Sequence, residues 1–136
     1  MKSFYLIFLS FISFSIVFGQ NGKVIDELII NSKILKGDRK FAVYLPPDYD
    51  SSNRSYPVLY LLHGLGDNQS AWIQFGEVLH TTDKAINSGI ATSMIIIMPD
   101  AGTGQFGYTN AMSGKWNYED FFFKEFIPFV ENQYRI

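Results

Sequence analysis

One short segment of the sequence combines residue types that can take part in catalysis. His63, Gly64, Leu65 and Gly66 stand together directly after a run of apolar residues. Two glycines around one residue allow the backbone to turn sharply and to point its N–H groups outward. At the carboxyl end of a strand in an open α/β sheet, an outward N–H group can stabilise an oxyanion that develops in a transition state. We therefore predict that the Leu65 N–H is an oxyanion donor and that His63 positions the loop instead of acting as a base. A simple tight turn is the alternative, because short glycine motifs are common.

The elements that would position this loop can be read from the hydrophobic pattern. Residues 58–62 and 94–98 form short, continuous apolar runs, which are typical of strands buried on both faces of a parallel sheet. Residues 24–35 and 39–45 have the pattern of two antiparallel strands, joined by a turn near Gly37 and Asp38.

The sequence also predicts two helices, one between the apolar runs 58–62 and 94–98 and one after the second run. The first covers residues 77–88 and ends at Gly89. Its expected buried positions are Val78, Leu79, Ala85 and Ile86. The second begins near Tyr118, and Pro128 is expected to kink or restart it because proline lacks the backbone N–H. A hairpin followed by β–α–β–α predicts an α/β fold with mixed strand directions at one edge.

Composition excludes several classes of protein. The chain has 136 residues, 47% of them apolar, which suits one folded domain and not a disordered chain. Lys and Arg number 11 against 13 Asp and Glu, so the net charge of −2 does not favour nucleic acid as a partner. The chain has no cysteine and only two histidines, His63 and His80. We therefore expect no metal and no cofactor.

The first residues have the pattern of a signal peptide. Lys2 precedes an uncharged, apolar stretch over 4–18, and Val17 and Gly19 are small enough for the −3 and −1 positions of a cleavage site. We predict a signal peptide over residues 1–19 and export from the cytoplasm, to the periplasm or outside the cell. An uncleaved membrane anchor is the alternative, but fifteen residues at ~1.5 Å each span only ~22 Å of a ~30 Å hydrocarbon core. On this prediction, the leader alone contacts a membrane.

The segment 56–66, Tyr-Pro-Val-Leu-Tyr-Leu-Leu-His-Gly-Leu-Gly, resembles the oxyanion segment of the putative esterase (esterase D-like) family of α/β-hydrolases. That family includes feruloyl and acetyl-xylan esterases, S-formylglutathione hydrolase and mycolyltransferases. Further matches follow in order at 41–47, 71–72, 97–102, 108–110, 118–121 and 126–128. The resemblance covers roughly residues 38–136 and implies a three-layer α/β/α sandwich with a mostly parallel sheet.

The resemblance also implies hydrolysis of carboxylic esters, such as feruloyl or acetyl esters on polysaccharide, by a Ser–His–Asp/Glu triad. The family carries its nucleophile at a G-x-S-x-G elbow on the strand that follows the second predicted helix. None of the serines here has glycine at both −2 and +2, and Ser113 is directly followed by Gly114. We therefore expect residues 20–136 to be the N-terminal part of a single domain, truncated before the elbow and inactive alone.

Three aromatic residues, Trp72, Tyr108 and Trp116, are predicted to shape the substrate side of the cleft, with loop packing as the alternative. Asp100 is interpreted as a turn residue and His80 as a solvated or packed helix residue. Two other functions remain open. One is a non-catalytic product that binds an acyl or sugar ligand, and the other is an acyltransferase of the same fold.

The predicted strand over 58–62 also has a consequence for solubility. If the family's strand order holds, this strand pairs on one side with 94–98 and has no partner on the other. An uncovered apolar edge invites self-association. We therefore expect the chain alone to be poorly soluble or partly molten.

Overall fold

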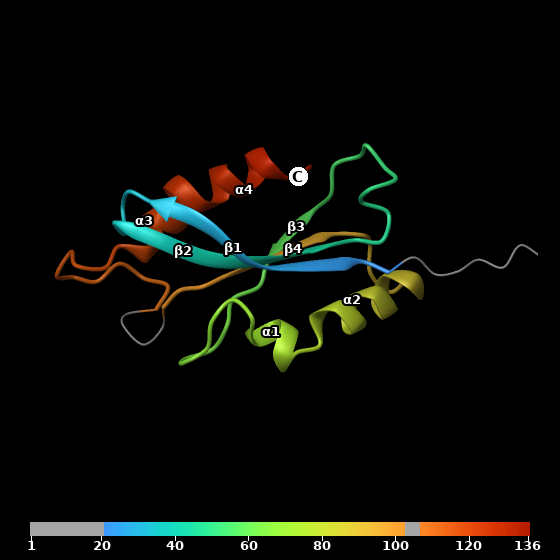
Figure 1. The fold of residues 1–136 in the computed structure, drawn as a ribbon, viewed down its shortest axis with the longest axis horizontal. Helices are drawn as coiled ribbons and strands as arrows, with labels where there is room; N and C mark the ends of the chain where they lie inside the picture. The colour runs from blue at the N-terminus through green and yellow to red at the C-terminus, as the bar shows by residue number, and fades with distance from the viewer. Residues whose placement is uncertain (1–20, 103–106) are drawn as a thin grey trace, which may run out of the picture.

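The computed structural model describes residues 21–102 and 107–136, so the predicted signal peptide over 1–19 lies outside the described residues. One sheet lies between two layers of helices (Figure 1). On one face are α1 (Ala71–Gln74) and α2 (Val78–Asn87). On the other are α3 (Tyr118–Phe121), the π-helical segment η1 (Phe122–Phe126) and α4 (Ile127–Gln133). This is the predicted three-layer α/β/α sandwich.

Within the described residues the sheet has four strands, β1 (Lys23–Ser32), β2 (Gly37–Leu45), β3 (Val58–Tyr60) and β4 (Ile95–Pro99). Their order is β1-β2-β4-β3. The β1–β2 and β2–β4 pairs are antiparallel, and the β3–β4 pair is parallel. The antiparallel strands β1 and β2 therefore lie at one edge of the sheet, as predicted. Because only the β3–β4 pair is parallel, the four described strands form a mixed sheet and not a mostly parallel one.

The central strands β2 and β4 explain why 94–98 reads as a continuous apolar run. All five residues of β4 are buried, because helices cover both faces of the sheet. Side chains alternate between two clusters. The cluster beneath α3, η1 and α4 contains Phe41, Val43, Leu45, Ile95, Ile97, Phe121, Phe126 and Val130. The cluster beneath α1 and α2 contains Ala42, Tyr44, Val78, Ile96 and Met98.

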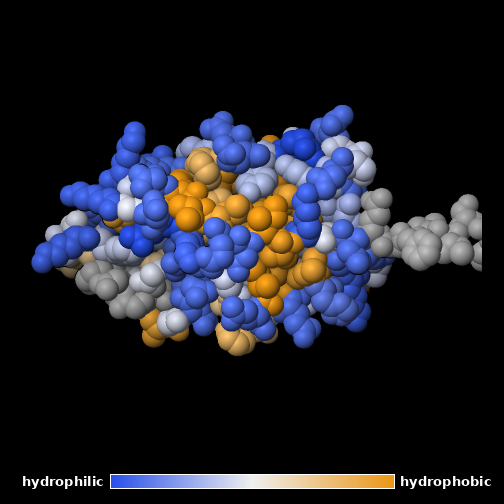
Figure 2. Space-filling view, viewed as in Figure 1, coloured by the Kyte–Doolittle hydropathy of each residue, from blue (hydrophilic) through white to orange (hydrophobic). Residues whose placement is uncertain are grey.

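Strand β3 differs from the prediction. It covers only Val58–Tyr60, and Leu59 is 43% exposed, so burial of 58–62 on both faces is wrong. The physical reason is its position, since β3 is the edge strand of the described sheet. The Tyr56 N–H donates to the Arg135 carbonyl oxygen (2.8 Å), which places Arg135 beside the start of this edge. Figure 2 shows apolar side chains gathered across the middle of the face seen there.

The hairpin turn also lies earlier than predicted. It covers residues 33–36, with a positive φ of 55° at Lys36, and Gly37 already belongs to β2. The carboxylate of Glu125, in η1, accepts the Ser32 hydroxyl proton at 2.6 Å and the Lys33 N–H at 3.1 Å. A side chain from the helix layer thus stabilises this turn, which no local turn signal in the sequence indicates.

Helix α2 confirms the helix predicted over 77–88 to within one residue at each end. Its buried side differs, however, because Leu79 is 38% exposed whereas Asp83 is buried. The Asp83 carboxylate accepts the Tyr44 hydroxyl proton at 2.8 Å and the Gly22 N–H at 3.0 Å. A buried carboxylate is tolerated there because it is fully hydrogen-bonded, and it joins α2 to the strands.

The second helix accommodates Pro128 by a local change of helical type. The Ile127 N–H bonds to the Phe122 carbonyl oxygen, five residues back, as in a π-helix. Pro128 is the second residue of α4, which follows η1 without a break because Phe126 and Ile127 both have helical backbone angles. The chain therefore changes helical type before Pro128 instead of stopping and restarting there. None of the helices within residues 21–102 and 107–136 has the length and apolar character needed to cross a membrane.

Candidate active site

The predicted glycine turn is present at the carboxyl end of β3. The Leu61 N–H still pairs with the Ile97 carbonyl oxygen at 2.8 Å, and the chain then leaves the sheet. The Asp67 N–H donates to the Gly64 carbonyl oxygen at 3.2 Å, which closes a four-residue turn. Gly66 has a φ of +84°, the value that the third residue of a type II turn requires. Leu65 occupies the tip, with its side chain 90% exposed.

Two side chains hold the backbone just before this turn. The Trp72 indole N–H, from α1, donates to the Leu62 carbonyl oxygen at 2.9 Å. The Tyr108 hydroxyl, from the segment after β4, donates to the His63 carbonyl oxygen at 2.9 Å. Burial raises the pKa of Tyr108 to about 12, so its phenol stays protonated and able to donate near neutral pH. The loop is therefore anchored by side chains from two different elements.

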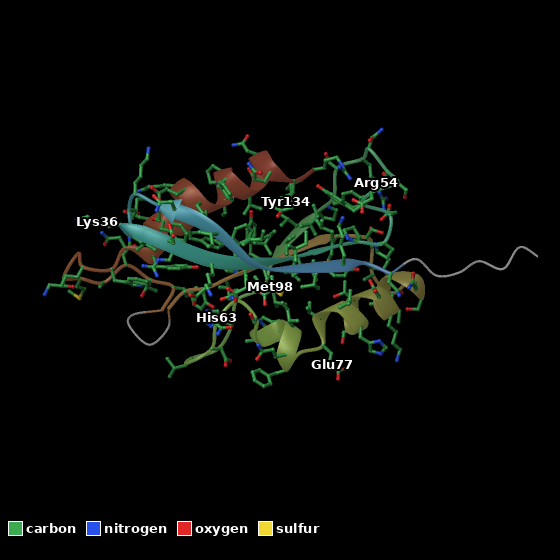
Figure 3. All side chains as sticks on the ribbon, in the orientation of Figure 1. Lys36, Arg54, His63, Glu77, Met98 and Tyr134 are labelled. Atoms are coloured by element: carbon green, nitrogen blue, oxygen red, sulfur yellow. The ribbon has the colours of Figure 1, made fainter. Side chains whose placement is uncertain are left out.

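His63 itself is buried, and both ring nitrogens have backbone partners. Nε2 accepts the Ala101 N–H at 3.0 Å, and Nδ1 lies 2.9 Å from the Gly64 carbonyl oxygen. Because Nε2 must accept, the hydrogen-bond pattern assigns the proton to Nδ1. Figure 3 shows His63 between the loop that follows β3 and the segment that follows β4. This geometry suits a positioning residue, because neither nitrogen is directed to a substrate proton.

Asp100 lies beside His63, with Oδ1 3.6 Å from Nε2. The same oxygen accepts the Gly102 N–H at 2.8 Å, which forms a local turn of the kind that aspartate favours. The geometry therefore matches the interpretation of Asp100 as a turn residue.

A cluster of polar residues, which no local sequence pattern indicates, joins the segment after the glycine turn to β1. Gln69 and Ser70 directly precede α1 and are only 3% and 5% exposed. The Ser70 hydroxyl donates to Asp26 at 2.6 Å, and the Gln69 amide donates to Glu27 at 2.8 Å. Both acidic residues lie at a bulge in β1, where Glu27 has a φ of +60°. Neither the bulge nor the pairing over more than forty residues leaves a signal in the local pattern.

Two pockets flank the loop. One, of about 340 Å³, is lined by Trp72 together with His63, Gly64 and Asp67. The other, of about 290 Å³, is lined by Tyr108 together with Leu62 and residues of α3 and η1. The structure therefore brings Trp72 and Tyr108 to the loop, where each side chain also holds the loop backbone, and their contact with a substrate stays a prediction.

Trp116 has a different place. It is only 9% exposed, its ring is stacked on Tyr118, and its indole N–H donates to the Gly107 carbonyl oxygen at 2.8 Å. In this position Trp116 supports Tyr118 from within the core. A third pocket, of about 560 Å³, lies along α2 and is lined by the exposed His80, away from the glycine turn. Among the described residues, no group of three or more His, Asp or Glu side chains is placed to hold a metal ion.

Comparison with known proteins assigns this arrangement to a family. The model of the family described as "Putative esterase" matches residues 32–136. The chain belongs to this family. Esterase Rv1288 of Mycobacterium tuberculosis is 38% identical over 96 residues, which are 68% of this chain and 20% of the relative. An endo-1,4-beta-xylanase/feruloyl esterase of Xylanibacter ruminicola is 31% identical over 99 residues, which are 68% of this chain and 13% of the relative.

A solved ferulic acid esterase has the same fold as this family member. Its TM-score is 0.78 at 36% sequence identity, over 85% of this chain and 46% of that chain. The architecture is therefore the α/β-hydrolase fold. The sequence spans less than half of this solved chain and a fifth or less of the two curated relatives above.

Proposed function

We propose that these residues form the oxyanion side of an exported serine esterase, which hydrolyses carboxylic esters through an acyl-enzyme. The nucleophile comes from outside residues 1–136, since no serine here stands in an elbow context. The observation that carries the proposal is the glycine turn after β3. Its tip residue, Leu65, is exposed, and the buried His63 ties its base to the segment after β4.

The role of Leu65 follows from its place in the turn. The hydrogen bond that closes the turn joins the Asp67 N–H to the Gly64 carbonyl oxygen and does not use the Leu65 N–H. The anchors on Leu62 and His63 restrict the turn to one position, and an oxyanion donor must be preorganised in this way. Leu65 between Gly64 and Gly66 is therefore the proposed donor.

The substrate class and the location are part of the same proposal. One relative is named as an endo-1,4-beta-xylanase/feruloyl esterase and one similar solved structure as a ferulic acid esterase, which supports feruloyl esters on polysaccharide as substrates. Acetyl esters on polysaccharide remain the alternative within this proposal. Polysaccharide of this kind lies outside the cell, and the signal-peptide pattern over 1–19 agrees with export. Mass analysis of the secreted protein tests this part, because cleavage after Gly19 would leave Gln20 at the N-terminus.

Proline at position 65 tests the oxyanion role directly. In an esterase that contains these residues, Leu65→Pro removes the backbone N–H, and a type II turn favours proline at that position. We expect kcat on nitrophenyl acetate to fall about 10²–10³-fold, as for other lost oxyanion donors. Leu65→Ala keeps the N–H and is the matched control, with kcat within about threefold of the parent. Equal kcat values in the two variants would remove Leu65 from the mechanism.

The nucleophile is tested separately. We expect a G-x-S-x-G motif within about 15 residues of further coding sequence, and labelling of that longer product by a fluorophosphonate. The 136-residue chain alone should neither be labelled nor release nitrophenol. Ester hydrolysis by the purified chain alone would contradict the proposal, and transfer of the acyl group to a sugar hydroxyl instead of water would favour an acyltransferase.

A further inference from the structure

The bulge in β1 is an irregular feature of the sheet that the proposed hydrolysis does not yet explain. The pairing register advances by three residues along β1, from Ile25 to Leu28, but by only two residues along β2. Glu27, inside the bulge, has a φ of +60°, which a residue with a side chain rarely adopts. Bulges recur beside active sites, where they re-aim side chains, and a strained residue persists only where its surroundings hold it.

The bulge allows two consecutive acidic side chains to reach neighbouring partners. In a regular strand, successive side chains point to opposite faces of the sheet. Here the Asp26 carboxylate accepts a hydrogen bond from the Ser70 hydroxyl at 2.6 Å, and the Glu27 carboxylate accepts one from the Gln69 amide at 2.8 Å. The Asp26 carboxylate also accepts the Glu27 N–H at 2.7 Å, which ties the backbone of the bulge to the same group.

The partners of these acids are buried polar side chains directly before α1. Gln69 is 3% exposed and Ser70 is 5% exposed. The Gln69 amide also donates to the Ser70 hydroxyl oxygen at 3.1 Å, which closes the network. A buried polar network whose members are paired is rigid, so the network fixes residues 69–70 relative to β1.

Both sides of the glycine turn depend on this fixed segment. The turn ends at Asp67, and the next residue, Asn68, accepts the Ser70 N–H on its side-chain oxygen at 2.9 Å. Two residues after Ser70, the Trp72 indole N–H donates to the Leu62 carbonyl oxygen at 2.9 Å. The position of residues 69–70 therefore sets both the exit of the turn and the anchor before its entry.

From these contacts we propose that Asp26 is a positioning residue for the oxyanion turn, with Glu27 as its support. By holding Ser70, Asp26 sets the start of α1 and so the reach of Trp72 toward the loop. Its effect is indirect and passes through the Leu65 N–H, which must be preorganised to stabilise an oxyanion. The inference rests on the proposed esterase function, because it names a residue that supports the same site.

The test compares variants of the longer esterase product that contains these residues. Asp26→Ala removes the acceptor of the Ser70 hydroxyl, so kcat on nitrophenyl acetate should fall about five- to twentyfold as the loop loses preorganisation. The fall should be smaller than in Leu65→Pro, because the donor itself remains. Asp26→Asn keeps one oxygen for the bulge and can donate to the Ser70 oxygen, so its kcat should stay within about threefold of the parent.

A double-mutant cycle distinguishes positioning from a general structural effect. If Asp26 acts through the Leu65 N–H, its loss costs nothing more once that N–H is absent. Asp26→Ala combined with Leu65→Pro should therefore have a kcat within about twofold of Leu65→Pro alone.

Two further variants show that the effect belongs to this hydrogen bond. Ser70→Ala removes the bond from the other side and leaves the bulge in place, so kcat should fall by the same factor as in Asp26→Ala. Val130→Ala is the control for a general loss of stability, because Val130 is 0% exposed and packs on the other face of the sheet. It should lower the thermal midpoint and leave kcat unchanged while the protein is folded.

The Trp72 indole N–H reports the anchor before the turn. Its proton should exchange with solvent faster in Asp26→Ala, because its hydrogen bond to the Leu62 carbonyl oxygen is weakened. The Trp116 indole N–H, which donates to the Gly107 carbonyl oxygen at 2.8 Å, is the internal reference and should exchange at an unchanged rate. Trp72→Phe and Trp116→Phe assign the two indole signals in the NMR spectrum.

The outcomes separate this inference from the proposed function. An unchanged kcat in Asp26→Ala and Ser70→Ala, an equal fall of kcat in the Leu65→Pro background, or unchanged exchange at Trp72 would overturn the inference. Any of these results beside a large difference in kcat between Leu65→Pro and Leu65→Ala leaves the proposed function standing. Equal kcat values in those two variants would instead refute the oxyanion role of Leu65, and the inference with it.

Discussion

The hydrogen bond between the Ala101 N–H and His63 Nε2 should be a large single contribution to the stability of the loop. Both groups are buried, with Ala101 0% and His63 6% exposed. His63→Leu keeps an apolar side chain of moderate size but leaves the Ala101 N–H without an acceptor. An unsatisfied buried donor costs about 1–3 kcal/mol, and loss of the Nδ1 bond to Gly64 adds about 0.5–1.5 kcal/mol. We expect the free energy of unfolding to fall by about 1.5–4.5 kcal/mol.

His63→Gln is the matched control. The amide oxygen of glutamine can stand close to the position of Nε2 and accept the Ala101 N–H, so this variant should lose no more than about 1 kcal/mol. Urea unfolding at low protein concentration gives the two free energies. Hydrogen exchange of the Ala101 amide should be faster in the leucine variant than in the glutamine variant, because only the leucine variant lacks the acceptor.

The reasoning is refuted if the leucine and glutamine variants have the same free energy of unfolding. It is equally refuted if protection of the Ala101 amide does not change in His63→Leu. Either result would mean that the ring acts by packing, for instance against Tyr108, whose centroid lies 5.5 Å from the His63 ring centroid.

Three other outcomes follow from the structure. Gly66→Ala should cost about 1–2 kcal/mol of stability, measured by urea unfolding, because a side chain is strained at a φ of +84°. Stability should fall as pH rises from 10 to about 12, because burial raises the pKa of both Tyr60 and Tyr108 to about 12 from 10.0. Over that range the unfolded chain loses these protons first, and urea midpoints against pH would show the decline. Leu59→Lys should reduce self-association in sedimentation experiments, since it places a charge at the exposed β3 edge.

Each of these predictions has a control. Gly114→Ala, with a φ of +69°, introduces similar strain in a turn elsewhere and should leave the glycine turn at 64–67 unaffected. Tyr60→Phe should flatten the decline of stability above pH 10, and an unchanged slope would contradict the burial argument. Ile90→Lys adds the same charge at an 84% exposed site outside the strands. Equal loss of association in Ile90→Lys and Leu59→Lys would mean that charge alone, and not the β3 edge, is responsible.

Much of the fold could be predicted because its signals are local. Apolar runs and 3.6-residue periodicity identified β4, α2 and the second helix, and the ordered motifs indicated the α/β-hydrolase fold before the comparisons confirmed it. The hairpin turn was misplaced because the Glu125 carboxylate that stabilises it is 93 residues from Ser32. The edge position of β3 was expected from the family's strand order, but the exposure of Leu59 was missed because a run of apolar residues does not reveal how far the helices cover each face of a strand.

The sequence alone determined the glycine turn after β3. Two glycines around Leu65 at the end of an apolar run specify a tight turn, because backbone freedom at glycine is a property of the residue itself. Only the tertiary structure decided the surroundings of that turn. It gave His63 Nε2 a partner 38 residues away and buried Trp116 behind Tyr118, while it left the Tyr118 hydroxyl without a partner among the described residues. These outcomes depend on packing between elements distant in the chain, which a local sequence pattern does not encode.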